Sequence, residues 1–297
     1  MPGRFVALTL LICTLWASLG IVIKLCLADA PPLGLAAVRM ALSSVVLWPW
    51  LQARWPAGLD GTAWRAMLIA ALCFSLLLGL THLGFAYVPA SRGVVLLNTT
   101  PLFVAVLAHY FVPREPLSLA KGTGLAVAFA GVVVIFARRL DGGATALGDA
   151  LMVLAAISWA FHTLWTKRAA EHADPATLTL VQFVGATVLL GVMSVASESV
   201  ALWRPTANLA AGIAYLAVVG TVIAWLLWVH VLRNVPARAA SAFMFTVPLI
   251  GVVLSAIVLG EAITLQFALG ACLVSAGIIA VNWRGRSRQV ARTDPRW

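Results

Sequence analysis

The sequence predicts an all-α polytopic membrane protein of ten transmembrane helices, arranged as two inverted five-helix repeats. Its composition, its series of apolar runs and an internal repeat predict this fold class. Of 297 residues, 62% are hydrophobic and 10% are charged, whereas soluble domains are about 45–50% apolar and about 25% charged. A soluble core cannot cover so much apolar surface, which argues against a soluble enzyme and against a nucleic-acid-binding protein.

Ten apolar runs, separated by Pro, Gly and charged residues, give the helices in order. A helix needs about 20 apolar residues to cross roughly 30 Å of hydrocarbon, at about 1.5 Å per residue. The predicted helices cover residues 5–27, 33–52, 66–87, 90–112, 118–137, 148–168, 176–197, 209–232, 238–259 and 264–283. The links between them are too short to hold a soluble domain.

The first of these helices imitates a secretory signal peptide. Arg4 precedes the apolar run 5–26, and Ala28, Asp29 and Ala30 after it have the pattern of a cleavage site. The apolar run of a signal peptide is usually about 7–15 residues long, and this run is longer. We therefore expect a spanning helix that stays in the mature protein.

The lysines and arginines predict the orientation. The net charge is +10, but most basic residues lie in links and in the tail, where they favour the cytoplasmic side and anionic headgroups over nucleic acid. With the N-terminus inside, fourteen basic residues are cytoplasmic and four lie outside, namely Arg92, Arg138, Arg139 and Arg204. Both termini are therefore predicted in the cytoplasm. In a bacterium the membrane is the inner one, because outer-membrane spans are barrels.

The four cysteines lie within or at the ends of apolar runs and have no C-x-x-C spacing. This pattern predicts no disulfide and no metal site, and no cofactor is expected. The expected partners are the lipid bilayer and a small-molecule solute, and nucleic acid is not among them.

Self-comparison reveals an internal repeat with offsets of 143, 147 and 146 residues. The matched pairs are Trp16 and Trp159, Lys24 and Lys167, Pro32 and Pro175, Arg39 and Gln182, Pro89 and Pro236, Pro101 and Pro248, Glu115 and Glu261, Gly124 and Gly270, and Gly131 and Gly277. The predicted organisation is a first repeat at 1–139, a linker at 140–147, a second repeat at 148–283 and a basic cytoplasmic tail at 284–297.

An odd number of helices in each repeat makes the second copy enter the membrane from the opposite side. Inverted repeats of this kind are typical of alternating-access transporters, whose substrate sites lie near the bilayer midplane. Plain duplication in a structural membrane protein is the alternative.

Two stretches carry a family resemblance: NTTPLF from Asn98 with PREP from Pro113, and TVPLI from Thr246 with LGE from Leu259. With the two five-helix halves and their Gly-rich last helices, they resemble EamA-type transporters of the drug/metabolite transporter superfamily. Pro113 and Arg114 depart from the usual Leu-Gly of that pattern. The resemblance implies ten helices, inside termini, a central cavity from helices 1–4 and 6–9, and export of small metabolites such as amino acids.

The predicted functional residues are polar, aromatic or Pro residues inside the spans. Pro101 and Pro248 each remove a backbone donor in mid-helix and are interpreted as hinges, or alternatively as packing kinks. Trp16 and Trp159, with Trp225 and Phe245, are candidates to line a cavity, although such rings also pack against other helices. Asn98 is a candidate to bind solute, or else to form a helix–helix hydrogen bond.

Ionisable residues inside spans are costly and often functional. Arg39 is a candidate for a solute carboxylate, and the alternatives are that it caps a neighbouring helix or extends outward. Its repeat counterpart Gln182 and the deep histidines His82 and His162 complete the substrate-binding candidates. All ten acidic residues fall in loops or at helix ends, which predicts facilitated diffusion or His-linked exchange rather than tight ion coupling.

Two further features are predicted to be structural. Glu115 and Glu261 are expected to cap the N-terminus of the helix that follows each of them. Gly124 and Gly131, with Gly270 and Gly277, give a small-residue stripe for close packing, either within one protomer or between two protomers of a homodimer.

The predicted function is export of small organic metabolites, such as amino acids or related zwitterionic or aromatic solutes, by alternating access. An exporter of cationic drugs or quaternary ammonium compounds and a non-transporting membrane scaffold are the alternatives. No enzyme is expected, because the sequence has no H-E-x-x-H, no G-x-S-x-G and no paired carboxylates.

Overall fold

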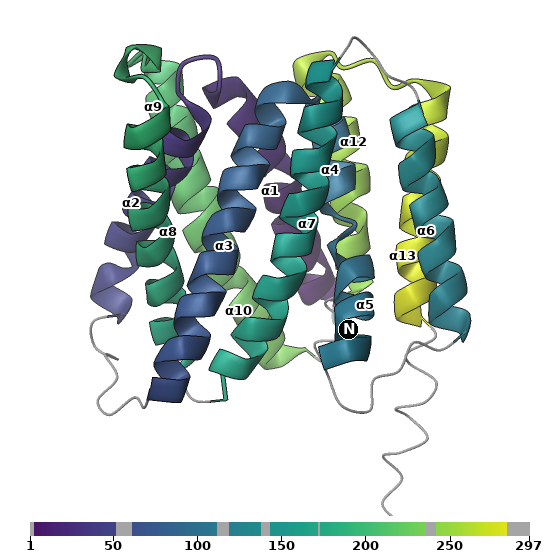
Figure 1. Cartoon of the computed structure of the whole chain (residues 1–297), viewed down its shortest axis with the longest axis horizontal. Coiled ribbons are helices and arrows are strands. Elements are labelled where there is room, and N and C mark those ends of the chain that lie inside the picture. The colour runs from purple at the N-terminus through teal and green to yellow at the C-terminus, as the bar shows by residue number, and fades with distance from the viewer. Residues whose placement is uncertain are drawn as a thin grey trace, which may run out of the picture.

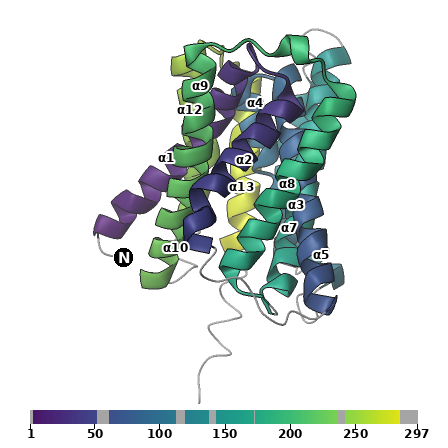
Figure 2. The ribbon, with the colours of Figure 1, turned by 90° about the vertical axis from the view of Figure 1, so that its left-hand side faces the viewer.

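The chain forms a bundle of helices that stand side by side (Figure 1). The computed structural model describes residues 3–51, 61–111, 119–137, 143–171, 173–235 and 242–283. The regular elements within these ranges are all helical. Helix α1 begins and α13 ends at the same end of the bundle (Figures 1 and 2), which we call the terminal end. The opposite end is called the distal end.

Residues 3–137 are called the first half below, and those of them that the structure describes form six helices. They are α1 (Gly3–Cys26), α2 (Pro32–Leu51), α3 (Gly61–Tyr87), α4 (Ala90–Leu97), α5 (Thr100–Phe111) and α6 (Leu119–Ala137). The helix ends lie within five residues of the predicted ones. The one predicted helix at 90–112 is in fact two helices, α4 and α5.

Residues 143–283, called the second half, follow a similar order. They form α7 (Gly143–Ala169), α8 (Pro175–Ser197), η2 (Val200–Leu202), α9 (Ala207–Ala214), η3 (Tyr215–Ile223), α10 (Ala224–Asn234), η4 (Ala242–Phe245), α12 (Thr246–Leu259) and α13 (Leu265–Trp283). Helices α9 and α10 continue one another through η3, which is π-helical.

The two hinge candidates, Pro101 and Pro248, were predicted in mid-helix, and that placement is wrong. The chain breaks at Asn98 and Thr99, and Pro101 then occupies the first turn of α5. Pro248 likewise occupies the first turn of α12, directly after the short helix η4. In a first turn a backbone N–H has no intrahelical acceptor, so proline costs nothing there.

The described helices have the length and composition of membrane spans. Seven are long and apolar enough to cross a bilayer, and three shorter apolar helices accompany them. Large apolar side chains lie on their outer surfaces, such as Val45 at 68% exposed and Val188 at 60%. Monomeric soluble proteins rarely expose so much contiguous apolar surface, so these faces suit lipid contact.

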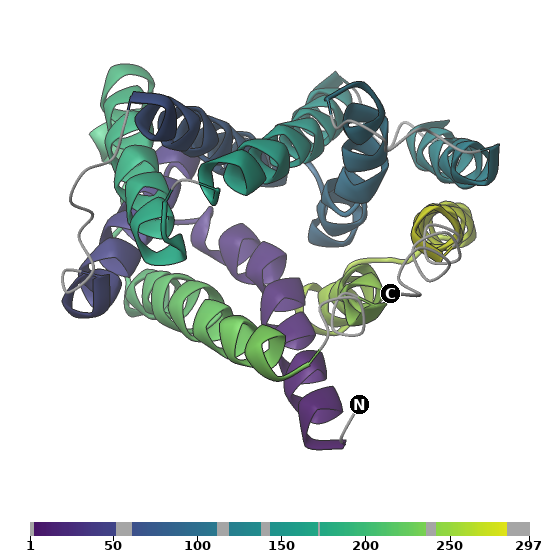
Figure 3. The same ribbon diagram turned by 90° about the horizontal axis from the view of Figure 1, so that it is seen from below.

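The glycine stripe packs within one protomer. A Cβ atom added to Gly131 of α6 would lie 2.7 Å from the backbone oxygen of Gly270 on α13, and one added to Gly277 would lie 2.5 Å from that of Gly124. The two backbones are therefore in direct contact, and Figure 3 shows α6 and α13 together at one edge of the bundle. Of the two alternatives for the stripe, the structure selects packing inside the protomer.

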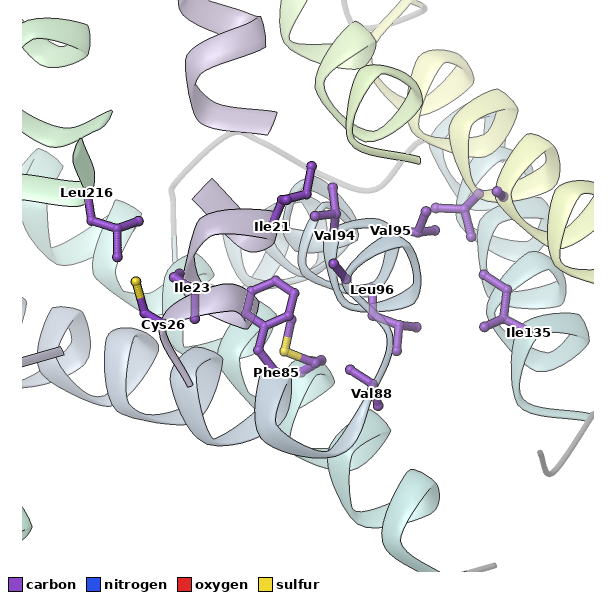
Figure 4. Close-up of a cluster of buried hydrophobic side chains, with 14 of the residues drawn as sticks. Ile21, Ile23, Cys26, Phe85, Val88, Val94, Val95, Leu96, Ile135 and Leu216 are labelled. Atoms are coloured by element: carbon purple, nitrogen blue, oxygen red, sulfur yellow. The ribbon is translucent and has the colours of Figure 1, made fainter. Parts of the chain in front are cut away.

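An apolar cluster holds the two halves together toward the distal end. Figure 4 shows Ile21 and Ile23 of α1, Phe85 of α3 and Val94 of α4 in this cluster, with Leu216 of η3 beside them. Four of these residues belong to the first half and one to the second. The halves therefore share one core here.

Candidate functional site

Two carboxylates at the distal end each bind the N-terminus of a helix. Glu198 accepts hydrogen bonds from the backbone nitrogens of Leu33 and Gly34, both at 2.8 Å, at the start of α2. Glu261 accepts from the backbone nitrogens of Ala90 at 2.6 Å and Ser91 at 2.9 Å, and from the Ser91 hydroxyl at 2.5 Å. Negative charge at helix N-termini is stabilising.

Glu261 was predicted to cap the following helix, and that prediction is wrong. The carboxylate instead binds α4 in the other half of the chain, where three donors, two backbone N–H groups and a hydroxyl, gather at the helix N-terminus. Glu115, its repeat counterpart, lies outside the described residues.

A buried ion pair and a lysine complete the distal end. The guanidinium of Arg92 on α4 forms a two-pronged ion pair with Asp149 on α7, and both side chains are buried. Lys24 donates from Nζ to the carbonyl oxygens of Phe85 at 2.8 Å and Val88 at 2.9 Å, at the end of α3. The sequence analysis assigned Arg92 to an outside loop, and that prediction is wrong. Arg92 is a buried residue of α4.

Deeper in the bundle, Arg39 of α2 meets η3. Its side chain is 6% exposed, and its Nε and Nη2 both donate to the Thr221 hydroxyl, at 3.2 and 3.0 Å. One turn further, the Ser43 hydroxyl lies 3.2 Å from the carbonyl oxygen of Ala217 on η3. Arg39 therefore neither caps a helix end nor extends outward, and it forms a polar contact between the two halves.

His82 of α3 is fully buried near this contact. Its Nδ1 lies 2.8 Å from the carbonyl oxygen of Leu78, so Nδ1 carries the hydrogen. Nε2 then has a lone pair for which the described part of the chain supplies no donor. The ring lies within electrostatic range of Arg39.

A second polar cluster joins α7 and α8. His162 Nε2 lies 3.2 Å from Gln182 Oε1 and 3.1 Å from the Thr166 hydroxyl, and Gln182 Nε2 donates to that hydroxyl at 3.2 Å. The Phe74 ring lies 5.2 Å from the His162 ring. The other imidazole nitrogen, Nδ1, is buried with no hydrogen-bond partner among the residues described.

The two polar clusters lie at different depths. Arg39 is seven residues from the distal start of α2, and Gln182 is seven residues from the terminal start of α8. At about 1.5 Å per residue, each lies roughly 10 Å from its own end of the bundle. The predicted residues thus fall into a distal group, Arg39 and His82, and a terminal group, His162 and Gln182.

The aromatic candidates are spread over other contacts. The Trp16 ring packs against Trp228 of α10, with centroids 5.5 Å apart, and Trp159 is 37% exposed. Trp225 is half-buried. Asn98, which directly follows α4, donates to the carbonyl oxygen of Val94 in that helix at 2.8 Å. The side chain of Phe245 lies outside the described part of the structure.

A family model settles which protein family this arrangement represents. The model of the EamA-like transporter family matches residues 3–137 and 146–283. The chain belongs to the EamA-like transporter family. It is accordingly a membrane transporter, and the resemblance noted from its sequence motifs is confirmed.

Relatives of this EamA-like chain carry transporter names. It is 29% identical, over 93% of its length and 95% of the other chain, to a "Probable amino-acid metabolite efflux pump" of Escherichia coli (strain K12). It is 27% identical, over 84% of its length and 81% of the other, to the "Uncharacterized inner membrane transporter YedA" of the same strain. A solved crystal structure that is 15% identical has the same fold, with a TM-score of 0.66 over 99% of this chain and 100% of the other.

Several site residues of this EamA-like transporter were missed in the sequence analysis. Thr221 and Thr166 organise the two polar clusters, and Trp228 is the aromatic partner of Trp16. A hydroxyl inside an apolar run is the one sequence signal for the two threonines. Among the described residues, no group of three His, Cys, Asp or Glu side chains could hold a metal ion.

Proposed function

We propose that this chain exports small organic metabolites, amino acids or related zwitterionic or aromatic solutes, by alternating access through a central cavity between its two halves. The observation that carries the proposal is the buried contact of Arg39 with Thr221, which joins the halves inside the membrane. Polar residues at such depth are rare unless they serve a solute or ion path.

The proposed architecture is a pair of inverted five-helix repeats, at 1–139 and 148–283, joined by the linker at 140–147. One family model matches a segment in each half, which supports duplication. Pro101 and Pro248 are repeat counterparts, and each begins a helix after an interruption. We assign these interruptions as the hinges on which the halves rock.

The distal contacts fit one state of such a cycle. Glu261 and Glu198 of the second half bind α4 and α2 of the first, and Arg92 of the first half pairs with Asp149 of the second. In this conformation the two halves are tied together at the distal end. Opening toward that side requires these contacts to break.

The solute path is proposed to use the candidates identified from sequence. These are Trp16, Arg39, His82, Asn98, Trp159, His162, Gln182, Trp225 and Phe245. Because the distal and terminal groups lie at different depths, a solute meets them in succession. His82 and His162 each keep a buried ring nitrogen with no partner in the described structure, which suits facilitated diffusion or His-linked exchange.

We place the protein in the inner membrane with both termini, and the tail at 284–297, in the cytoplasm. The excess of basic residues on that side supports this orientation, and a relative named as an inner membrane transporter supports the location. The glycine stripe is occupied within one protomer, so it gives no support to a homodimer.

Solute flux into proteoliposomes tests the proposal. Purified protein should exchange a radiolabelled amino acid for internal unlabelled amino acid, and Trp159→Ala or Asn98→Ala should lower the rate several-fold. Flux that neither change affects would remove these two residues from the path. Absence of flux for amino acids, aromatic solutes and quaternary ammonium compounds alike would favour a scaffold, and flux of the ammonium compounds alone would favour the drug exporter.

A further inference from the structure

The two buried arginines of the described structure have different surroundings. Arg92 has a carboxylate partner, Asp149. Among the residues that the structure describes, Arg39 has the Thr221 hydroxyl as its one hydrogen-bond partner, and this group is uncharged. A buried cation without an anion is costly, and natural proteins pair such charges. The structure therefore raises the question of which anion Arg39 serves.

The carboxylates of the described residues are engaged elsewhere. Asp149 binds Arg92, Glu198 and Glu261 bind helix N-termini, Asp174 caps α8, and Asp29 accepts from Thr206. Glu171 is exposed just after α7 ends, on the terminal side. The four remaining acidic residues fall outside every predicted span. Arg39 therefore has no acidic partner in the described part of the chain.

The hydrogen bonds of Arg39 leave much of its guanidinium available. The group has five N–H donors. Two of them point at Thr221, whose own hydrogen is donated to the carbonyl oxygen of Leu216 at 2.7 Å. The other three, on Nη1 and Nη2, have no acceptor among the described residues. The edge formed by Nη1 and Nη2 is one of the two edges through which a guanidinium binds a carboxylate by two parallel hydrogen bonds, and at Arg39 Thr221 occupies the other edge.

The backbone opposite Arg39 is also unusual. The segment η3 is π-helical over Tyr215–Ile223, in the middle of an otherwise α-helical span. π-Helical turns are rare and frequently occur at functional sites. Here the segment presents Thr221 to Arg39 and the carbonyl oxygen of Ala217 to Ser43, so it fixes the guanidinium from one side only.

We infer that Arg39 binds the carboxylate of the transported solute, so that the substrates are carboxylic acids held by this group at the seam between the halves. This inference rests on the proposed function and names its substrate class. Thr221 is the positioning residue that orients the guanidinium. A solute whose carboxylate is replaced by a carboxamide loses both the charge and one acceptor, and is rejected.

Counterflow in proteoliposomes tests this inference with matched probes. The probes are radiolabelled phenylalanine, leucine and glutamine, with unlabelled phenylalaninamide and phenylalanine methyl ester as competitors. The free amino acids should compete with the label, and the amide and ester should fail. Arg39→Gln should lower exchange of the acids by about 30-fold or more, as expected for loss of a buried charged partner.

Two further variants separate positioning from folding. Thr221→Val should raise the KM for the acids several-fold with little change in kcat, and Thr221→Ser should restore it. Ser44→Ala is the matched control, because its hydroxyl donates only to Met40 in its own helix, and exchange should equal that of wild type. Acid exchange that survives Arg39→Gln unchanged would overturn the inference.

The inference and the proposed function can fail separately. If wild type exchanges only the amide, the ester or quaternary ammonium compounds, transport stands and the role of Arg39 is wrong. If nothing is exchanged, the proposed function fails. The melting temperature of the purified full chain then tests whether Arg39 still forms a binding site for carboxylic acids. Stabilisation by phenylalanine in wild type, absent in Arg39→Gln, would retain an acid site, and no stabilisation in either would overturn it.

Discussion

The distal end and the middle of this bundle use charge in different ways. At the distal end, Glu198, Glu261 and the Arg92–Asp149 pair meet helix N-termini or opposite charges at hydrogen-bond distance. Nearer mid-depth, Arg39 has one neutral partner, and His82 and His162 each keep a ring nitrogen that the described residues do not satisfy. Satisfied charges hold helices together, whereas incompletely satisfied ones are available to a molecule that enters.

The comparison is sharpest between the two buried arginines. Both have about the same exposure, 6%, and both bridge the first and second halves of the chain. The difference that decides their energetics is the chemistry of the partner, a carboxylate for Arg92 and, among the described residues, a hydroxyl for Arg39. The same substitution should therefore have opposite effects at the two positions.

The largest effect is expected at the distal ion pair. Arg92→Met leaves Asp149 buried without its partner, and breaking a buried pair in this way costs about 3–5 kcal/mol. The free energy of unfolding, measured in detergent with increasing denaturant, should fall by that amount. The double variant Arg92→Met with Asp149→Leu should recover most of the loss, because no charge is left buried. A single variant as stable as wild type would mean that the pair is not structural.

At Arg39 the corresponding substitution should change the free energy of unfolding in the opposite direction. Arg39→Met removes a buried cation that has no anion in the described structure, so the free energy of unfolding without solute should rise by about 1–2 kcal/mol. The same denaturant titration measures it, with Ser44→Ala as the neutral control on the same helix. A loss of several kcal/mol would show that Arg39 has a structural partner, and the contrast with Arg92 would disappear.

Glu261 should show an intermediate effect. Glu261→Gln removes the charge at the N-terminus of α4 and one of the acceptors for Ala90 and Ser91. Loss of a helix cap costs about 1 kcal/mol, and thermal unfolding should register it. Because this contact ties the halves, the variant should also expose an engineered distal cysteine to a membrane-impermeant thiol reagent faster than wild type. Unchanged labelling would mean that Glu261 stabilises α4 but does not hold the distal side closed.

The smallest effect is expected in the terminal group. Thr166→Val removes the hydroxyl shared by His162 and Gln182, and hydrogen bonds between spanning helices contribute about 0.6 kcal/mol on average. His162 and Gln182 still contact each other at 3.2 Å, so much of the cluster remains. A loss above 2 kcal/mol in the unfolding titration would mean that this cluster belongs with the structural contacts of the distal end.

The sequence was sufficient to predict an all-helical fold and the approximate bounds of the described helices, because an apolar run of about 20 residues bounded by Pro and charge forms a helix in a bilayer. It did not predict the break at Asn98 and Thr99 or the π-helical segment η3. Both are changes of hydrogen-bond register inside continuous apolar runs, and hydropathy does not depend on that register. Pro101 was predicted as a hinge in mid-helix. It lies in a first turn instead, because the helix is interrupted at Asn98 and Thr99 directly before it.

The site was predicted only in part. Arg39, His82, His162 and Gln182 were found as polar residues at membrane depth, since such residues are costly and rare. The hydroxyl partners Thr221 and Thr166 were not predicted, because Thr221 lies 182 residues from Arg39 and the helix faces that meet depend on packing. The same holds for Glu261, because the next helix along the chain is α13 but the helix that its carboxylate binds is α4.

Thermal unfolding of wild type and Arg39→Met, each with and without a transported amino acid, tests the central claim most directly. The account predicts that Arg39→Met is the more stable of the two without solute, and that saturating solute stabilises wild type alone. The contradicting result is an Arg39→Met protein that is as destabilised as Arg92→Met, with a solute response equal to that of wild type.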